Sequence, residues 1–256
     1  MNDPLLLQVI IIGHMLGDFY FISRHYMTPD ETAGVKHCLG YVFSIALALF
    51  LIAWFGGVGY THTLLAIFVL ICSVHIVTII ITKQNFWKRI LASNRFIKSK
   101  RFVLDQAAHL IILFIIWLFL EQRIDVGCYL YDHAHLVKII LGLVFILRPV
   151  SSLIESGAIW DFSAIKRTDE FKSSSKMIGY LERVIIYFAL LNGELISAIA
   201  IVIAAKTIVR PLMNDKNNND TSAPKRDYYV IGTLLSIISV FAIAALLGLI
   251  PPPPTP

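Results

Sequence analysis

The sequence predicts an all-α protein, a polytopic transmembrane helical bundle that forms a single integral membrane domain over residues 1–256. Composition is the first reason: 57% of the 256 residues are hydrophobic and 15% are charged, whereas a soluble domain carries about a quarter charged residues. The second reason is a series of about seven apolar segments of near-spanning length. A binding or catalytic site must therefore lie within the bundle or in its short loops.

Four apolar segments form the expected N-terminal half, residues 1–121. They cover residues 4–22, 37–55, 62–82 and 102–120, and each is long enough to cross about 30 Å of hydrocarbon. The first segment lacks both a basic region and a small-residue cleavage site, so we interpret it as a retained span and not as a signal peptide.

The connection between the third and fourth segments indicates the orientation. Residues 83–101 contain seven basic residues and no acidic one, which places them on the cytoplasmic side and the N-terminus outside. Their apolar residues recur near helical spacing. This fits either an amphipathic helix on the membrane surface or a plain topology anchor.

The expected C-terminal half, residues 135–250, contains segments 136–153, 179–208 and 228–250. Arg148-Pro149 predicts a kink in the fifth segment, and Asn192-Gly193-Glu194 interrupts the sixth. Straight alternation puts loop 209–227 outside, although the loop is basic. Either the positive-inside rule fails at this loop, or one late segment is broken or re-entrant and does not cross the membrane. The sixth segment is the best candidate for such a helix.

Ionisable side chains inside the first four segments are the most informative local feature. Membrane-buried ionisable groups are costly and mark functional sites by default. Two pairs stand four residues apart and so share one helix face. On the predicted topology, four different helices place these groups at similar depth toward the cytoplasm. They are His14, Asp18, His37, His75, Asp105 and His109.

Histidine and carboxylate ligands on a rigid bundle suit a divalent metal such as Zn, Mn or Fe. We expect all six residues as metal ligands, with Asp18 and Asp105 also acting as catalytic residues. Lys36 and Gln106 are expected in a supporting shell or against the substrate. Two other interpretations stay open: hydrogen bonds that lock the helices together, and a proton or ion pathway.

Several blocks of the chain resemble a bacterial polytopic membrane protein family, domain of unknown function 3307. The blocks are GHMLGDFYF around His14 and Asp18, FVLDQAAHL around Asp105 and His109, and IGYLER ending at Arg183. The resemblance implies a multi-pass protein of the bacterial cytoplasmic (inner) membrane. It also implies a gene that often lies beside the gene of a small cytosolic SatD-type protein, but no established activity. We expect an acid about one turn after His75, where this chain has Thr78 and Ile79, so one metal ion is favoured over two.

Two functions from different classes follow. The first is a metal-dependent membrane hydrolase that acts from the cytoplasmic face on a lipid-linked or membrane-proximal substrate. The alternative is a non-enzymatic component: a transporter or channel, or the membrane arm of a regulatory or defence system with a cytosolic partner.

Composition also bounds the expected partners. The lipid bilayer is one, and an oligomer is compatible with the sequence. The net charge of +5 comes from residues that flank the spans, so no nucleic acid is expected. The three cysteines form no CxxC pair and indicate neither a disulfide framework nor a zinc knuckle.

Overall fold

Helices are the regular elements of the described part of the chain. A computed structural model describes residues 4–21, 31–56, 61–83, 95–120, 131–155, 169–194, 197, 199–204 and 222–250. Every element within these ranges is helical, which confirms the all-α class for them. The chain divides into two compact units, Met1–Val144 and Phe145–Pro256, so the division falls inside the fifth predicted segment.

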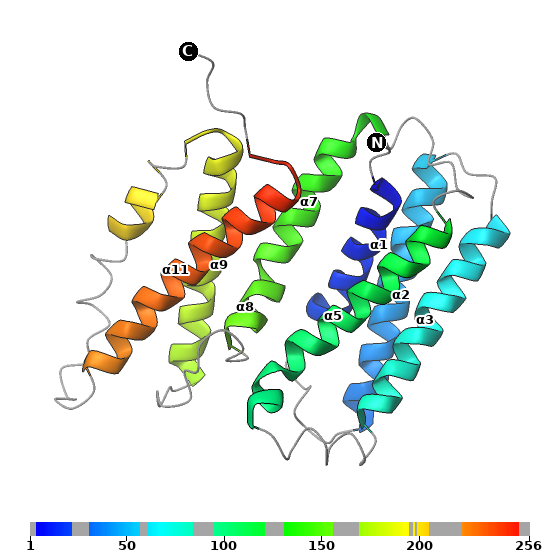
Figure 1. Cartoon of the computed structure of the whole chain (residues 1–256), viewed down its shortest axis with the longest axis horizontal. Helices are drawn as coiled ribbons and strands as arrows, with labels where there is room; N and C mark the ends of the chain where they lie inside the picture. The colour runs from blue at the N-terminus through cyan, green and yellow to red at the C-terminus, as the bar shows by residue number, and fades with distance from the viewer. Residues whose placement is uncertain are drawn as a thin grey trace. The chain divides into compact units, whose positions relative to one another are not determined.

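Four long helical segments build the N-terminal unit. Helix α1 (Leu5–Met15) continues into the short η1 (Leu16–Tyr20), and α2 (Glu31–Gly56), α3 (Thr61–Lys83) and α5 (Arg95–Leu120) follow, before α7 (Ala134–Ile146) begins. Helix α1 packs against α2 and α5, and α2 packs against α3 (Figure 1). Their apolar faces meet in a core that includes Ile10, Ile45, Ile52, Ile67 and Ile71.

Two glycines four residues apart allow α1 and η1 to approach α2 closely. A Cβ atom added at Gly13 would lie 2.7 Å from the Cβ of Ala48. One added at Gly17 would lie 2.8 Å from the Cδ2 atom and 2.9 Å from the Cα atom of Tyr41. Small residues at this spacing are a common device for close helix packing in membranes, and here they set the distance between the first two helices.

The element η1 is a π-helical turn that directly continues α1. Its wider turn is closed by a hydrogen bond from the Phe21 amide to the Leu16 carbonyl, five residues earlier, at 3.3 Å. Asp18 stands in the middle of this turn. Single π-helical turns are rare and often mark functional sites, so the turn draws attention to Asp18 independently of its charge.

The C-terminal unit contains α8 (Arg148–Glu155), α9 (Asp169–Leu191) and α11 (Ser222–Leu246). Helices α9 and α11 pack together, and α8 contacts both. The buried guanidinium of Arg183 on α9 joins all three. It donates hydrogen bonds to the hydroxyls of Ser151 and Ser236 and to the Leu147 carbonyl, so it satisfies polar groups that burial would otherwise leave costly.

The predicted interruption of the sixth segment is confirmed, and the fifth segment is divided into two helices at the predicted position. Helix α7 ends at Ile146 and α8 begins at Arg148, next to Pro149. Helix α9 ends at Leu191, and Gly193 follows with a φ of 77°. Glycine adopts this left-handed conformation without strain, which explains why the helix stops there.

Within the described ranges, two helical stretches are long and apolar enough to cross a membrane. They are Lys36–Trp54 and Ala134–Ile154. Four shorter stretches are apolar as well: Leu5–Tyr20, His62–Val77, Val103–Phe119 and Ile231–Leu246. A topology of about seven spans stays a prediction.

Candidate metal centre

Five of the six predicted ligand residues come together inside the N-terminal unit. His14 comes from α1, Asp18 from η1, His37 from α2, His75 from α3 and His109 from α5. All five are buried, with exposed fractions between 0% for His14 and 7% for Asp18. The close packing at Gly13 and Gly17 brings the members on α1, η1 and α2 together.

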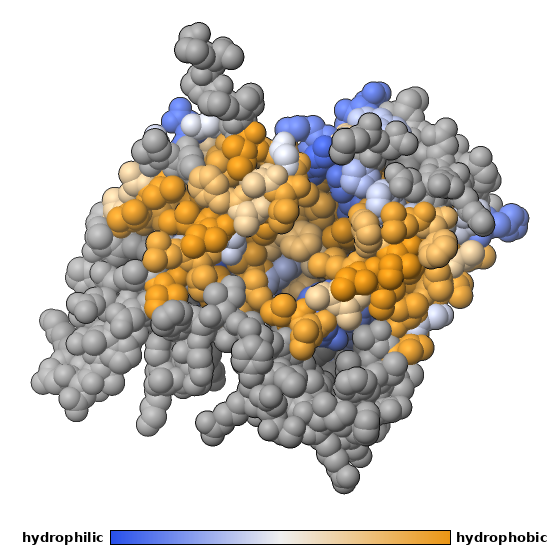
Figure 2. Space-filling view, in the orientation of Figure 1, coloured by the Kyte–Doolittle hydropathy of each residue, from blue (hydrophilic) through white to orange (hydrophobic). Residues whose placement is uncertain are grey.

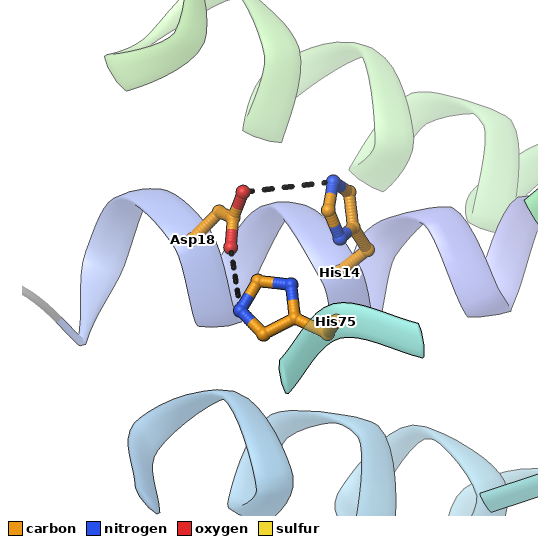
Figure 3. A group of neighbouring side chains, drawn as sticks. All are labelled: His14, Asp18 and His75. Atoms are coloured by element: carbon orange, nitrogen blue, oxygen red, sulfur yellow. Dashed lines mark ion pairs between the residues drawn. The ribbon is translucent and has the colours of Figure 1, made fainter. Parts of the chain in front are cut away.

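The carboxylate of Asp18 lies at the middle of the histidine cluster. Its oxygens are 3.7 Å from the His14 Nε2 atom, 3.8 Å from the His37 Nε2 atom and 3.7 Å from the His75 Nε2 atom (Figure 3 draws the first and third contacts). These separations exceed hydrogen-bond length. The Nε2 atoms of the three histidines thus lie around the carboxylate without being hydrogen-bonded to it.

His14, Asp18 and His75 each offer one ligand atom, and these atoms lie within 4.8 Å of one another, so the group could hold a metal ion. The His37 and His75 Nε2 atoms are 3.1 Å apart and share a hydrogen bond. Adjacent ligands of one ion, each about 2.1 Å from it, stand at a similar separation. His37 therefore lies close enough to join the group after a small adjustment.

Hydrogen bonds from neighbouring groups orient the ligand atoms. The Tyr41 hydroxyl lies 3.1 Å from the His14 Nδ1 atom, and the Tyr41 ring stacks on His75 at 3.5 Å between centroids. Gln106 donates to the Asp18 Oδ2 atom at 3.0 Å. Such second contacts fix the orientation and tautomer of histidine ligands in metal sites.

His109 has a defined tautomer. Its Nδ1–H donates to the backbone carbonyl of Asp105 at 2.9 Å, and a carbonyl can only accept. The lone pair of the neutral ring is therefore on Nε2. The His109 ring lies 5.2 Å from the His14 ring and 5.1 Å from the His75 ring, between centroids, which places it at the edge of the cluster.

Several buried polar atoms of the cluster have no hydrogen-bond partner among the described residues. They are the His14 Nε2, Asp18 Oδ1, His75 Nδ1 and His109 Nε2 atoms. Each such atom costs about 1–3 kcal/mol when it is left unsatisfied, and a buried carboxylate needs a compensating positive charge. A bound cation would satisfy the His14 Nε2 and Asp18 Oδ1 atoms and balance the charge of the carboxylate, so the group of His14, Asp18 and His75 fits a metal.

The remaining predicted residues have different places. Asp105 is half-buried and contacts the cluster through its carbonyl group. Gln106 reaches Asp18, as expected of a supporting residue, whereas Lys36 is exposed on α2. Sequence reasoning missed Tyr41. The available signal was its position four residues after His37, which puts both side chains on one face of α2.

Comparison with known proteins identifies the family of the N-terminal unit. No curated protein and no solved structure matches the chain. A family model matches residues 6–138, a range that contains the whole histidine and aspartate cluster and ends before the IGYLER block. The chain therefore belongs to the family described as protein of unknown function (DUF3307).

Proposed function

We propose that the protein is a multi-pass protein of the bacterial cytoplasmic membrane whose N-terminal unit binds one divalent metal ion, Zn, Mn or Fe, for use in hydrolysis. The observation that carries the proposal is the buried group of His14, Asp18 and His75. His37 and His109 lie beside the group and complete its surroundings.

The distribution of side chains supports a membrane location. Ionisable residues such as His14 and Arg183 are buried, whereas large apolar residues are exposed: Trp54 is 71%, Phe119 75% and Leu246 86% exposed. Most of the described surface in Figure 2 is apolar. Water disfavours this arrangement, but lipid favours it because apolar side chains then face hydrocarbon.

The ligand set supports one transition-metal ion. Imidazole nitrogens suit Zn, Fe and similar ions, and the carboxylate adds negative charge. Asp18 supplies the carboxylate of the group, and one carboxylate balances part of the charge of one divalent ion. Two ions would require more negative ligands, so the cluster supports a single metal.

Hydrolysis is the chemistry that such an ion supplies when bound, because it activates a water molecule as a nucleophile near neutral pH. The chain's own residues would hold and orient the site. Asp18 would act as a ligand, Gln106 holds its carboxylate, and the Asp105 carbonyl fixes the His109 ring through the Nδ1–H group. The substrate is proposed to be lipid-linked or membrane-proximal.

A non-enzymatic role is the second candidate, and the complete burial of the cluster favours it. A sealed polar cluster that joins α1, α2, α3 and α5 can lock a bundle through interhelical contacts. The same bundle would serve as a transporter or channel, or as the membrane arm of a system with a cytosolic partner. A measurement of the metal content distinguishes a purely structural polar cluster from a metal centre.

The test uses the full-length protein in detergent, stripped of metal and then equilibrated with Zn(II), Mn(II) or Fe(II). Elemental analysis should find about one ion per chain. His14→Ala and His75→Ala should lose it, whereas His133→Ala, a change at an exposed histidine, should keep it. Wild-type protein without stoichiometric metal, or equal metal in His14→Ala, would contradict the proposal.

The hydrolase part needs its own measurement. Metal-loaded protein in nanodiscs of bacterial lipid should release phosphate or fatty acid, and His75→Ala should not. Full metal occupancy without release of either product would leave the metal centre standing and favour the non-enzymatic role.

A further inference from the structure

A small cavity adjoins the His75 ring on the side away from the proposed metal. The His75 Nε2 atom faces the Asp18 carboxylate at 3.7 Å, and Figure 3 shows the other ring nitrogen, Nδ1, on the side of the ring away from Asp18. His75, His109 and Tyr41 line the cavity together with apolar side chains of α3 and α5, whereas His14 and Asp18 do not. The cavity therefore adjoins one proposed ligand but not the metal position itself.

The cavity has room for one water molecule and two polar partners for it. Its volume is about 10 Å³, roughly that of one water-sized probe. The His75 Nδ1 and His109 Nε2 atoms are buried and have no hydrogen-bond partner among the described residues. The centroids of the two rings are 5.1 Å apart, and two atoms hydrogen-bonded to the same water stand roughly 4.5–5 Å apart. One water molecule can therefore bridge the two rings.

The backbone of α5 sets the direction of these hydrogen bonds. The His109 Nδ1–H donates to the Asp105 carbonyl, so the His109 Nε2 atom can only accept. A water that donates to this atom keeps its lone pairs for a donor on the other side of the cavity. The His75 Nδ1 atom is such a donor when it carries the ring proton, and the lone pair of the neutral ring is then on Nε2. This order of donors and acceptors leaves the nitrogen that faces Asp18 as the metal-binding atom of His75.

We propose that the cavity binds one water molecule and that His109 is a positioning residue, which acts on the metal ligand His75 through this water. The inference rests on the proposed metal function and deepens it. Histidine ligands commonly donate their second N–H to a carbonyl, a carboxylate or a water, which fixes the ring and its tautomer. His109 holds a ligand in place and is not itself a ligand, which gives it a role different from the one that its sequence position predicted.

Two replacements of His109 separate the role of the acceptor atom from that of the filled space. Glutamine can place an amide oxygen close to the position of Nε2 and keeps an acceptor, whereas leucine fills the space without one. The assay titrates Co(II), whose visible absorption bands report binding, into metal-free full-length protein in detergent. His109→Leu should raise the Kd about 10–100-fold, as the loss of a supporting contact does in metal sites, and His109→Gln should restore a value close to that of the wild type.

Nuclear magnetic resonance of the Zn(II)-loaded protein gives a readout that a change in packing alone would not move. In wild-type protein labelled with nitrogen-15 in its histidines, His75 should bind the metal through Nε2 and carry its proton on Nδ1. His109 should be neutral, with an Nε2 atom that binds no metal. The His75 Nδ1–H should show a nuclear Overhauser effect at the water frequency, which His109→Leu abolishes and His109→Gln keeps.

The outcomes separate the two proposals. Wild-type protein that binds neither Co(II) nor Zn(II) would overturn the metal function and this inference with it. Zn(II) bound through His75 Nδ1, a metal-bound His109 Nε2 atom, or a His75 Nδ1–H without a water contact would overturn the inference alone, and none of these wild-type measurements requires a variant to fold. Equal Kd values for His109→Leu and His109→Gln would likewise contradict the positioning role.

Discussion

Replacing Gly17 with alanine should disturb the stability of the N-terminal unit because of one short contact. The new Cβ atom would lie 2.9 Å from the Cα atom of Tyr41, whereas ordinary contacts begin at 3.4 Å, so η1 and α2 would have to separate by roughly 0.5 Å. Overpacking of this kind costs about 1–3 kcal/mol. The higher helix propensity of alanine stabilises the folded state by up to about 1 kcal/mol relative to glycine. With a cost in the middle of the first range, about 2 kcal/mol, the expected net loss is about 1–2 kcal/mol.

The assay is thermal unfolding of the full-length protein in detergent, followed by circular dichroism. A loss of this size should lower the Tm by roughly 2–8 °C for a chain of this length. The matched control is Gly232→Ala on α11, where an added Cβ meets no atom within 4 Å; this change should leave the Tm unchanged or raise it slightly. A Tm for Gly17→Ala equal to or above that of the control would refute the close packing of η1 on α2.

Three further predictions follow from the site and the second unit. Tyr41→Phe keeps the ring that stacks on His75 but removes the hydroxyl beside His14, so the Kd for Co(II) should rise about 10–100-fold; an unchanged Kd would show that only the ring matters. Acidification should weaken Co(II) binding because the ligands bind only as neutral imidazole and ionised carboxylate, and a Kd that is constant between about pH 7.5 and pH 5 would argue against histidine ligands. Arg183→Leu removes the hydrogen-bond donors that join three helices of the C-terminal unit, and should cost about 3 kcal/mol in thermal unfolding while metal content stays at the wild-type level.

Local spacing predicted part of the candidate site, and long-range packing decided the rest. The pair His14 and Asp18 follows from helix periodicity, and His75 was placed at a similar depth by the predicted alternation of spans. Tyr41 was missed because its one sequence signal, a position four residues after His37, gains meaning only when the helix that carries His14 is placed beside it. The same is true of Gly17, whose importance depends on a neighbour that is distant in sequence.

The π-helical turn shows a second limit of sequence reasoning. A helix with regular spacing predicts that Asp18 lies one turn beyond His14, but not that the turn widens there and ends at Tyr20. The widening depends on how η1 fits against α2. Likewise, the spacing of Asp105 and His109 puts two side chains on one helix face, but it does not predict that the Asp105 backbone carbonyl accepts a hydrogen bond from His109. Backbone groups are not visible in residue-type patterns.

The late segments were more predictable because glycine and proline act locally. The break after Leu191 and the change from α7 to α8 near Pro149 both follow from the conformations that these residues favour or forbid. The contact of Arg183 with two serines on different helices required the packed structure, because neither serine is near Arg183 in sequence.

X-ray absorption spectroscopy at the edge of the bound metal tests the central claim most directly. A metal held by His14, Asp18 and His75 should show nitrogen and oxygen ligands at about 2.0–2.2 Å, the outer-shell scattering of at least two imidazole rings, and no sulfur ligand. His14→Ala should remove one imidazole from this pattern or abolish binding. A sulfur ligand at about 2.3 Å would contradict the proposed metal centre and would implicate the buried Cys72. A shell of oxygen atoms without imidazole would contradict it as well.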